Sequence, residues 1–396
     1  MKLSAKVRAI EESQTLALAA KAKRMRELGV DVVSLTAGEP DFPTPRHIKD
    51  AAIEAIEADF TKYTATTGIP DLIEAVIAKF ASENDLHFDP RHVVVSSGAK
   101  QSICNVLQAI CNKGDEVVFF SPYWVSYPEM VKLADATPVI VPTFASDGFR
   151  PDIQKLRRAI TGKTKALILN SPNNPSGIVF TQHEYEQIAE IVHKTGIYVI
   201  SDEIYEKVVY DDNSHFSIGS IKRIRENVIT VNGVSKAFAM TGWRIGYAGG
   251  PGDVMEAAGR VQSQVTSNPN SIAQKAALAG LRGSDTDVRR MVDEFKRRRD
   301  FVHEKLSAIA DVRTALPGGA FYFFFDVSRF FGRGINELRI RNSADLGTYL
   351  LDHHHVATVP GVAFGDDSSL RISYACSMTE LEIGLQRIRE GLESLT

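Results

Sequence analysis

Ser235 and Lys236 stand side by side directly after a short apolar segment, and Arg244 follows eight residues further on. The β-branched residues at 228–231 are typical of a buried strand, and the Asn-Gly pair at 232–233 ends it. A lysine held in a dry site near another cation has a lowered pKa and becomes a nucleophilic amine. Ser235 and Arg244 could hold an anion such as a phosphate, the arginine in bidentate geometry.

An amine nucleophile combined with a phosphate-binding pair is what pyridoxal 5′-phosphate (PLP) requires, because it forms a Schiff base at one end and is anchored by its phosphate at the other. A Ser-Lys pair alone is more often a surface lysine on a Gly-rich turn, so the assignment depends on the rest of the chain. A PLP site also needs a carboxylate, ring-oxygen donors, an aromatic stacking partner and a substrate-binding arginine. The chain offers a candidate for each.

The elements that must position these residues alternate between strands and helices. Apolar strands are expected at residues 92–96, 116–120, 139–142, 165–169, 198–201 and 228–231. Loops with polar residues follow them, which predicts an α/β fold with a mostly parallel sheet flanked by helices. Ligands on such sheets bind beyond the carboxyl ends of the strands. The candidate residues at these ends are Trp124, Asn174, Asp202, Tyr205, Ser235 and Lys236.

Other segments complete the expected chain order. Further helices are expected at residues 5–28, 45–58, 71–83, 99–111, 185–195, 285–309, 344–353 and 379–395, and further strands at 30–35, 356–360 and 370–374. The long helix at 285–309 is expected to bridge to a second domain, and its basic run at 296–299 is interpreted as a solvated face. The histidines at 353–355 are interpreted as a helix end, and no metal site is expected.

The cofactor ring has candidates on three sides. Asp202 is placed to face the pyridine nitrogen and keep it protonated, so that the ring acts as an electron sink. Asn174 and Tyr205 are candidates to hold the ring's 3-oxygen, and Trp124 is a candidate to stack on the ring. Lys236 is the candidate to form the Schiff base and to move the proton between the substrate's α-carbon and the cofactor.

The phosphate has a second expected contact at Gly98 and Ala99, where a strand runs into a helix. Free N–H groups and the helix dipole at such a start favour an anion. The phosphate site is thus expected to combine this backbone with Ser235 and Arg244. Arg371, in the segment L-R-I-S-Y-A, is the candidate that binds the substrate's α-carboxylate in a bidentate manner.

Eight segments together carry a family resemblance. They are T-A-G-E-P-D (36–41), Y-T-A-T-T-G (63–68), S-S-G-A-K-Q (96–101), S-P-Y-W-V-S-Y-P-E-M (121–130), N-S-P-N-N-P-S-G (170–177), S-D-E-I-Y-E (201–206), S-K-A-F-A-M-T-G-W-R-I-G-Y (235–247) and L-R-I-S-Y-A (370–375). With them, essentially the whole chain resembles fold-type I PLP enzymes of the class I/II aminotransferases, and most closely the bacterial aspartate aminotransferase subgroup Ib. The resemblance implies a large PLP-binding domain at 45–290 and a small α+β domain formed by 1–44 and 291–396.

The resemblance also implies roles for individual residues. Lys236 would carry the Schiff base, and Tyr63 would reach the cofactor phosphate of the other subunit, so that the active unit is a homodimer with shared sites. Lys100, beside the phosphate-binding backbone and the cofactor, would read the distal carboxylate of a dicarboxylic substrate. The residues expected to contact the amino-acid substrate are Gly38, Trp124, Asn174 and Arg371.

The reaction implied by the resemblance moves an amino group between L-aspartate or L-glutamate and 2-oxoglutarate or oxaloacetate in a ping-pong mechanism. The alternatives are transamination of prephenate to arogenate or of aromatic amino acids, alone or as a second activity, and lyase chemistry on the same fold. Subgroup members that use prephenate carry an S-x-T motif, matched here by Ser13 and Thr15. Glu11 stands where some of them have a lysine, and Glu12 replaces a frequent proline. An acidic residue there does not favour prephenate, which stays an open alternative.

Composition sets the broad class. The chain has 396 residues and a net charge of −3 at pH 7, which gives no electrostatic footprint for nucleic acid or an anionic membrane. The sequence shows no apolar stretch of membrane length and no signal peptide, and its three cysteines lack metal spacing, so a reducing cytoplasm is expected. A third alternative, the sensor domain of a transcription regulator, calls for an additional DNA-binding domain and a basic surface, which are not expected here.

Overall fold

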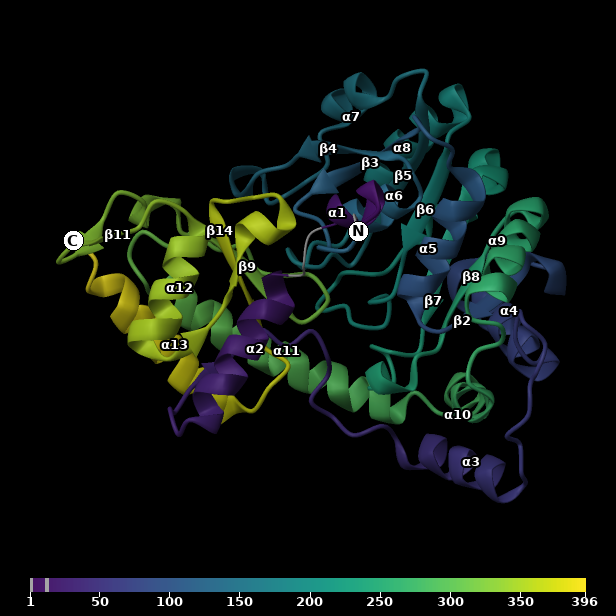
Figure 1. Ribbon diagram of the computed structural model, residues 1–396, viewed down its shortest axis with the longest axis horizontal. Helices are drawn as coiled ribbons and strands as arrows, with labels where there is room; N and C mark the ends of the chain where they lie inside the picture. The colour runs from purple at the N-terminus through teal and green to yellow at the C-terminus, as the bar shows by residue number, and fades with distance from the viewer. Residues whose placement is uncertain (1–2, 11–13) are drawn as a thin grey trace.

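The computed structural model describes residues 3–10 and 14–396, which are arranged around a seven-stranded sheet and a three-stranded sheet (Figure 1). The larger sheet has the strand order β2-β8-β7-β6-β5-β3-β4. Its strands are β2 (Val93–Ser96), β3 (Glu116–Ser121), β4 (Thr137–Pro142), β5 (Thr164–Asn170), β6 (Tyr198–Asp202), β7 (Val228–Gly233) and β8 (Gly246–Gly249). The expected α/β fold with a mostly parallel sheet is confirmed.

Strand register brings the polar strand ends together at one edge of this sheet. β3, β4, β5, β6 and β7 run parallel, whereas β8 runs antiparallel to both β2 and β7. Asn170 at the end of β5 is paired with Asp202 at the end of β6, and Asp202 is in turn paired with Val231. The loops that follow β5, β6 and β7 therefore leave the sheet side by side.

Helices cover both faces of the sheet because alternate side chains of each strand point to opposite sides. In β3, Val117 and Phe119 pack with one set of helices, whereas Val118 packs with another. The first set is α5 (Ala99–Ile110), α6 (Tyr127–Leu133) and α9 (Gly252–Val265), and the second is α7 (Ile153–Ala159) and α8 (Gln182–Thr195). At the β2 end lie α3 (Arg46–Glu57), α4 (Pro70–Asn84) and α10 (Ser271–Arg282).

Four helices, α6, α7, α9 and α10, are not predicted from the sequence. In α10 the buried face consists mainly of Ala273, Ala276, Ala277 and Gly280, and this helix packs against α3 and α4. Small residues allow such close packing, since a Cβ on Gly280 would come within 3.1 Å of the Ile48 side chain. A face of alanine and glycine lacks the large apolar repeat that identifies an amphipathic helix in a sequence.

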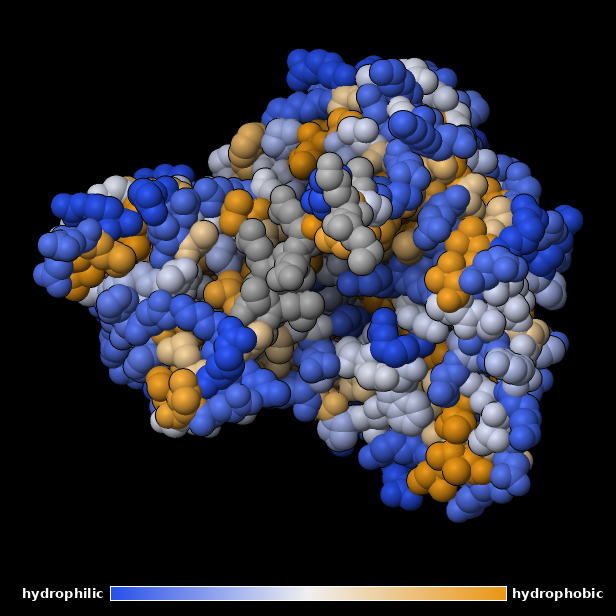
Figure 2. Space-filling model, in the orientation of Figure 1, coloured by the Kyte–Doolittle hydropathy of each residue, from blue (hydrophilic) through white to orange (hydrophobic). Residues whose placement is uncertain are grey.

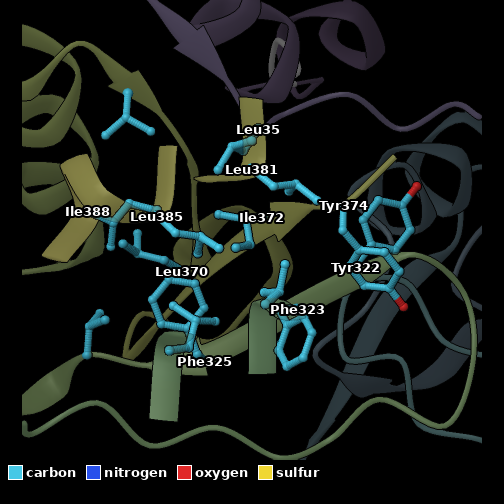
Figure 3. Close-up of a cluster of buried hydrophobic side chains, with 14 of the residues drawn as sticks. Leu35, Tyr322, Phe323, Phe325, Leu370, Ile372, Tyr374, Leu381, Leu385 and Ile388 are labelled. Atoms are coloured by element: carbon cyan, nitrogen blue, oxygen red, sulfur yellow. The ribbon is translucent and has the colours of Figure 1, made fainter. Parts of the chain in front are cut away.

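The three-stranded sheet lies apart from the first sheet and is joined to it by the long helix α11 (Thr286–Ser307) (Figure 1). Its strands are β13 (Val359–Pro360), β14 (Ser369–Ser373) and β9 (Tyr322–Asp326), and its helices are α12 (Ser343–His354) and α13 (Met378–Glu393). Leu381, Leu385 and Ile388 of α13 face the side chains of β9 and β14 in a continuous apolar core (Figure 3). A short hairpin pairs β10 (Gly334–Ile335) with β11 (Leu338–Arg339).

The start of the chain does not form a single helix, and its two helices pack in different places. The expected helix at 5–28 is wrong, because α1 (Ala5–Arg8) is separated by non-helical Ala9 and Ile10 from α2 (Gln14–Glu27). α2 packs beside β1 (Val33–Ser34) and β12 (Val356–Ala357). α1 contacts the end of α6, where Lys6 Nζ donates to the Leu133 carbonyl at 3.1 Å and to Asp135 at 2.8 Å. Such tertiary contacts override local helix propensity.

Two expected strands near the core of the three-stranded sheet are also shorter than predicted. Within 30–35 only β1 (Val33–Ser34) forms, and it pairs in parallel with β12 (Val356–Ala357). The segment 356–360 is divided between two sheets, because β12 pairs with β1 while β13 pairs with β14. The chain start is thereby tied to the chain end. Among the described residues, no helix is both long and apolar enough to cross a membrane.

The interpretation of 296–299 as a solvated face is wrong for half of the run. Arg298 is 6% exposed and Arg299 is 1% exposed. Arg298 Nη1 lies 2.7 Å from Asp41, and Arg299 Nη1 lies 2.6 Å from Asp211. Four consecutive helical residues cover all sides of a helix, so two of them must turn toward the protein. Arg298 ties the loop before α3 to α11.

The contact between β8 and the start of α5 generates a stability prediction. A Cβ on Gly246 would overlap the backbone of Gly98 and Ala99, whereas a Cβ on Gly162 would meet no atom within 4 Å. We expect Gly246→Ala to reduce the free energy of unfolding by about 1–3 kcal/mol, because backbone atoms cannot yield as a flexible side chain can. Gly162→Ala should change it by less than about 0.5 kcal/mol. Urea unfolding measures both, and equal stabilities of the two variants would contradict the packing argument.

Candidate active site

A cavity of about 620 Å³ opens at the carboxyl edge of the seven-stranded sheet and is closed on its other side by the loop at 34–39 and by residues of β9 and β14. All the predicted site residues except Gly98 and Tyr63 line it. They are Gly38, Ala99, Lys100, Trp124, Asn174, Asp202, Tyr205, Ser235, Lys236, Arg244 and Arg371. The fold therefore gathers residues from seven of the eight sequence segments around one space.

One end of the cavity is suited to an anion. α5 begins at Ala99, and Gly98 at its N-cap has a φ of +91° and no side chain to bond the first N–H groups of the helix. The Arg244 guanidinium lies directly against Gly98, where any Cβ would overlap it, and its Nη1 donates to the Thr241 carbonyl at 2.9 Å. Ser235 is buried, and it also lines the cavity. Helix N–H groups, a hydroxyl and a guanidinium together can hold a phosphate.

Lys236 projects its amine into the middle of the cavity. The residue is half-buried, and Nζ donates to the Gly38 carbonyl. Burial lowers the pKa of Lys236 to about 8, a shift that Glu39 opposes and the nearby Arg244 and Arg371 reinforce. An amine with this pKa is partly neutral near pH 7 to 8 and can act as a nucleophile or a base.

Asp202 lies on the sheet side of the same cavity at the end of β6. It is 4% exposed, and burial raises the pKa of its carboxyl to about 6, although hydrogen bonds from Tyr127 and from the Ile204 N–H act in the opposite direction. At neutral pH the carboxylate is therefore ionised in an otherwise apolar setting. A buried anion of this kind is a partner for a protonated ring nitrogen.

Tyr205 and Asn174 present polar groups to the cavity near Lys236. The Tyr205 hydroxyl lies 2.8 Å from the Tyr322 hydroxyl, and the Tyr205 ring centroid is 5.8 Å from Lys236 Nζ. Burial raises the pKa of Tyr205 well above its usual value, so the hydroxyl keeps its proton. The Asn174 side-chain oxygen accepts a hydrogen bond from Arg371, which leaves its NH₂ group as the donor for a bound molecule.

Arg371 is a buried cation without an acidic partner. It is 4% exposed, and its Nη1 and Nη2 donate to Asn174 Oδ1 at 3.1 Å and to the Thr36 carbonyl at 2.8 Å. Its guanidinium lies over the rings of Tyr322 and Phe364, at 4.6 and 5.0 Å from their centroids. Among the described residues, no carboxylate forms a salt bridge with Arg371, and its Nε has no hydrogen-bond partner. An entering carboxylate would supply the missing charge and acceptor.

Lys100 and Trp124 lie against each other in the lining of the cavity. Lys100 Nζ lies 4.8 Å from the centroid of the Trp124 ring, and burial followed by the repulsion of Arg244 lowers the pKa of the lysine. Two further cations of α2, Lys23 and Arg26, also line the cavity. Neither residue is predicted from the sequence, because exposed basic residues on a surface helix carry no signal of their own. Clustered positive charge of this kind attracts substrates with more than one negative charge.

Tyr63 does not reach this cavity. Its side chain is 92% exposed, in a loop held by hydrogen bonds from Gln274 to Thr64 at 3.1 Å and from Gln262 to the Thr66 carbonyl at 2.7 Å. Its predicted contact with a second subunit stays a prediction.

The positions linked to prephenate are only partly described. Glu11, Glu12 and Ser13 lie outside the described residues, and Gln14 and Thr15 are described only as backbone of α2.

Two aromatic residues of the site were also missed. Tyr322 bonds to Tyr205 and lies under Arg371, but it belongs to an aromatic run that reads simply as a buried strand. Tyr127 donates to Asp202 at 2.6 Å from the start of α6. Tyr127 reaches Asp202 because α6 packs against the edge of the sheet, and no local sequence pattern signals that contact.

The comparisons with known proteins agree with this geometry. The family profile of aminotransferase class I and II matches residues 30–388. A Petunia hybrida protein described as a bifunctional aspartate aminotransferase and glutamate/aspartate-prephenate aminotransferase is 45% identical over 99% of this chain and 83% of its own length. The aspartate aminotransferase of Rhizobium meliloti superposes with a TM-score of 0.97 at 40% identity and covers 100% of both chains. The structure of the Thermus thermophilus aspartate aminotransferase with maleate superposes with a TM-score of 0.93 at 44% identity, and the match covers 99% of this chain and 100% of that chain.

The similarity spans the whole chain rather than a single motif. Its profile match includes the strand ends, the start of α5 and β14, which supply the cavity residues. The chain belongs to the class I and II aminotransferases, within their aspartate aminotransferase group, a family that uses PLP.

Proposed function

We propose that this chain is a PLP-dependent aminotransferase that transfers the amino group between L-aspartate or L-glutamate and 2-oxoglutarate or oxaloacetate. The observation that carries the proposal is Arg371, a buried guanidinium without an acidic partner in the cavity that Lys236 enters. Lys100 adds a second cation to the lining of the same cavity. Two cations in one cavity suit a substrate with two carboxylates, and the Thermus thermophilus relative was solved with maleate, a dicarboxylate.

The cavity residues fit PLP. Gly98, Ala99, Ser235 and Arg244 would hold the phosphate, because they combine free helix N–H groups, a hydroxyl and a guanidinium that has no salt-bridge partner among the described residues. Asp202 would face the pyridine nitrogen, Asn174 and Tyr205 would hold the ring oxygen, and Trp124 would stack on the ring. When bound, PLP supplies an electron sink that stabilises negative charge at the substrate's α-carbon.

The protein's own groups would then bind the substrate and move a proton. Arg371 would hold the α-carboxylate, with Gly38 and Asn174 beside it, and Lys100 would hold the distal carboxylate. Lys236 would accept the proton from the substrate's α-carbon and deliver it to the cofactor, for which a pKa of about 8 is well matched to neutral pH.

Closure of the cavity would come from the second sheet. We propose that residues 1–44 and 291–396 form a small domain that closes on a large domain at 45–290. Gly38 and Arg371 belong to the small domain in this division, and the Arg298–Asp41 ion pair at 2.7 Å would make the loop at 36–41 move with α11. Closure would exclude water from the reacting groups.

The active unit would be a homodimer. Tyr63 is 92% exposed, and Ile53, Ile56 and Val265 are 45%, 53% and 63% exposed. Figure 2 shows hydrophobic surface gathered over α3, the helix that carries Ile53 and Ile56. Large apolar side chains left open to water support a subunit interface on this side, from which Tyr63 would reach the partner's phosphate site.

Prephenate is the second candidate acceptor. The Petunia hybrida relative, 45% identical, is named for this activity as well as for aspartate. Prephenate also carries two carboxylates, and Lys23 and Arg26 extend the positive lining beyond Lys100. The cavity of about 620 Å³ is within the range of sites that hold a cofactor and a ring-sized substrate.

Half-reactions test the proposed function directly. PLP-loaded protein mixed with aspartate or glutamate should convert bound PLP to pyridoxamine 5′-phosphate quickly, as followed by absorbance, and much more slowly with alanine or phenylalanine. Addition of 2-oxoglutarate or oxaloacetate should reverse the change, and return with prephenate would establish the second acceptor. Lys236→Ala should fold but show no turnover. Normal turnover in that variant, or no spectral sign of bound PLP in the natural protein, would refute the proposal.

The lowered pKa of Lys236 predicts how fast the apoprotein captures PLP. Only the neutral amine attacks, so the rate at saturating PLP should rise about tenfold per pH unit and level off above about pH 8. An ordinary lysine would still gain reactivity near pH 10. Stopped-flow absorbance from pH 6.5 to 10 measures the profile, and a rate that still rises at pH 10 would contradict the burial argument.

Substitution of Lys100 tests its role in specificity. Lys100→Met keeps the apolar stem over Trp124 and removes the charge, so kcat/KM for aspartate should fall about 10- to 100-fold while that for alanine stays nearly unchanged. Arg371→Lys is the matched contrast, because it should weaken every amino-acid substrate. Steady-state kinetics with both donors measure this difference, and an equal loss for alanine in Lys100→Met would place Lys100 elsewhere in the mechanism.

A further inference from the structure

Tyr127 contacts two residues that line the cavity, Asp202 and Trp124. It is the first residue of α6, it is 2% exposed, and its hydroxyl donates to Asp202 Oδ2 at 2.6 Å. Burial, followed by the neighbouring Asp202 charge, raises the pKa of Tyr127 well above its usual value. The hydroxyl therefore keeps its proton and remains a donor to the carboxylate.

The Asp202 carboxylate is held by two elements at once. Oδ2 receives the Tyr127 hydroxyl from α6, and Oδ1 receives the Ile204 N–H at 3.3 Å from the loop after β6. The 2.6 Å contact is the shorter of the two and is assisted by the negative charge of its acceptor. Because Oδ2 accepts the short hydrogen bond from Tyr127, Oδ1 is the Asp202 oxygen that has only the longer hydrogen bond, from the Ile204 N–H.

The ring of Tyr127 supports a second wall of the cavity. Its centroid lies 5.5 Å from that of Trp124 with an interplanar angle of 88°, an edge-to-face contact. On another side it lies 6.1 Å from Phe119 of β3. Edge-to-face pairs prefer defined orientations, so the position of Trp124 depends on the position of Tyr127.

We propose that Tyr127 is a positioning residue of the cofactor site, whose hydroxyl orients the Asp202 carboxylate toward the pyridine nitrogen and whose ring sets the plane of Trp124. The inference rests on the proposed function, because it concerns the same PLP site. Tyr127 touches neither substrate nor the reacting atoms and acts through Asp202 and Trp124. Loss of the hydroxyl would leave a buried carboxylate with one weak hydrogen bond, which disfavours its charged form.

The test uses Tyr127→Phe, which keeps the ring against Trp124 and Phe119 and removes only the hydroxyl. The dissociation constant of PLP should rise about 10- to 100-fold in equilibrium dialysis at pH 8. With ¹⁵N-labelled PLP, the pyridine nitrogen resonance should move toward that of the unprotonated ring. For aspartate, kcat should fall while KM stays within about twofold, because Arg371 and Lys100 are unchanged.

Tyr349→Phe is the matched control. Tyr349 is also 2% exposed, and its hydroxyl bonds to Ser394 at 2.7 Å in the core of the three-stranded sheet, away from the cavity. The Tyr349→Phe variant should lose stability as Tyr127→Phe does, because each loses one buried hydroxyl, but its PLP affinity and pyridine nitrogen resonance should stay unchanged. A purely structural role of Tyr127 would make the two variants alike.

A double-mutant cycle tests whether the Tyr127 hydroxyl affects PLP binding through Asp202. In an Asp202→Ala background, Tyr127→Phe should change the PLP dissociation constant by less than about twofold, since the group it orients is gone. If the natural protein binds PLP and Tyr127→Phe matches it in affinity and resonance, or if the loss persists in the Asp202→Ala background, the positioning role is overturned and the proposed function stands. If the natural protein binds no PLP, both are overturned.

Discussion

Arg371 is a cation buried without a counter-ion, and the architecture around it is arranged to tolerate that state. Its guanidinium is satisfied by neutral acceptors only, the Asn174 side-chain oxygen and the Thr36 carbonyl, and by the faces of Tyr322 and Phe364. These groups come from the loop after β5, the loop after β1, β9 and the turn before β14. Because a buried charge is costly unless it is surrounded by dipoles and π-faces, the burial of Arg371 depends on groups contributed by both sheets and their loops.

The chain also contains buried charges that are fully paired, and the contrast separates structure from function. Lys79 contacts Glu206, and the Glu203 carboxylate accepts hydrogen bonds from Ser201, Ser217, Asn84 and His215. Burial opposes the charged form of His215, but the Glu203 carboxylate raises its pKa on balance. The carboxylates of this cluster therefore face Lys79 and His215 at close range. It stabilises the segment after β6, whereas Arg371 and Arg244 lack acidic partners among the described residues and can accept ligand charge.

The sequence predicted the parts of the site that follow from strand ends and missed those that follow from packing. Asn174, Asp202 and Lys236 each follow an apolar run within about five residues, and parallel pairing then brings them to one edge whatever the details of the helices. Tyr322 and Tyr127 reach the site only because β9 and α6 pack against that edge, which no local pattern encodes. The burial of Arg298 and Arg299 and the break after α1 have the same origin, since both depend on distant partners.

One physical cause, burial, acts on the two ionisable groups at the centre of the cavity and moves both toward neutrality. It raises the pKa of Asp202 to about 6 and lowers that of Lys236 to about 8. Because the two values remain on either side of pH 7, the carboxylate stays charged while part of the amine becomes neutral. A deeper shift of Asp202 would remove the anion that a ring nitrogen needs, so the hydrogen bonds from Tyr127 and Ile204 limit it. Burial makes Lys236 nucleophilic, and these hydrogen bonds, together with the charge of Lys236, favour the ionised form of Asp202 in the same buried site.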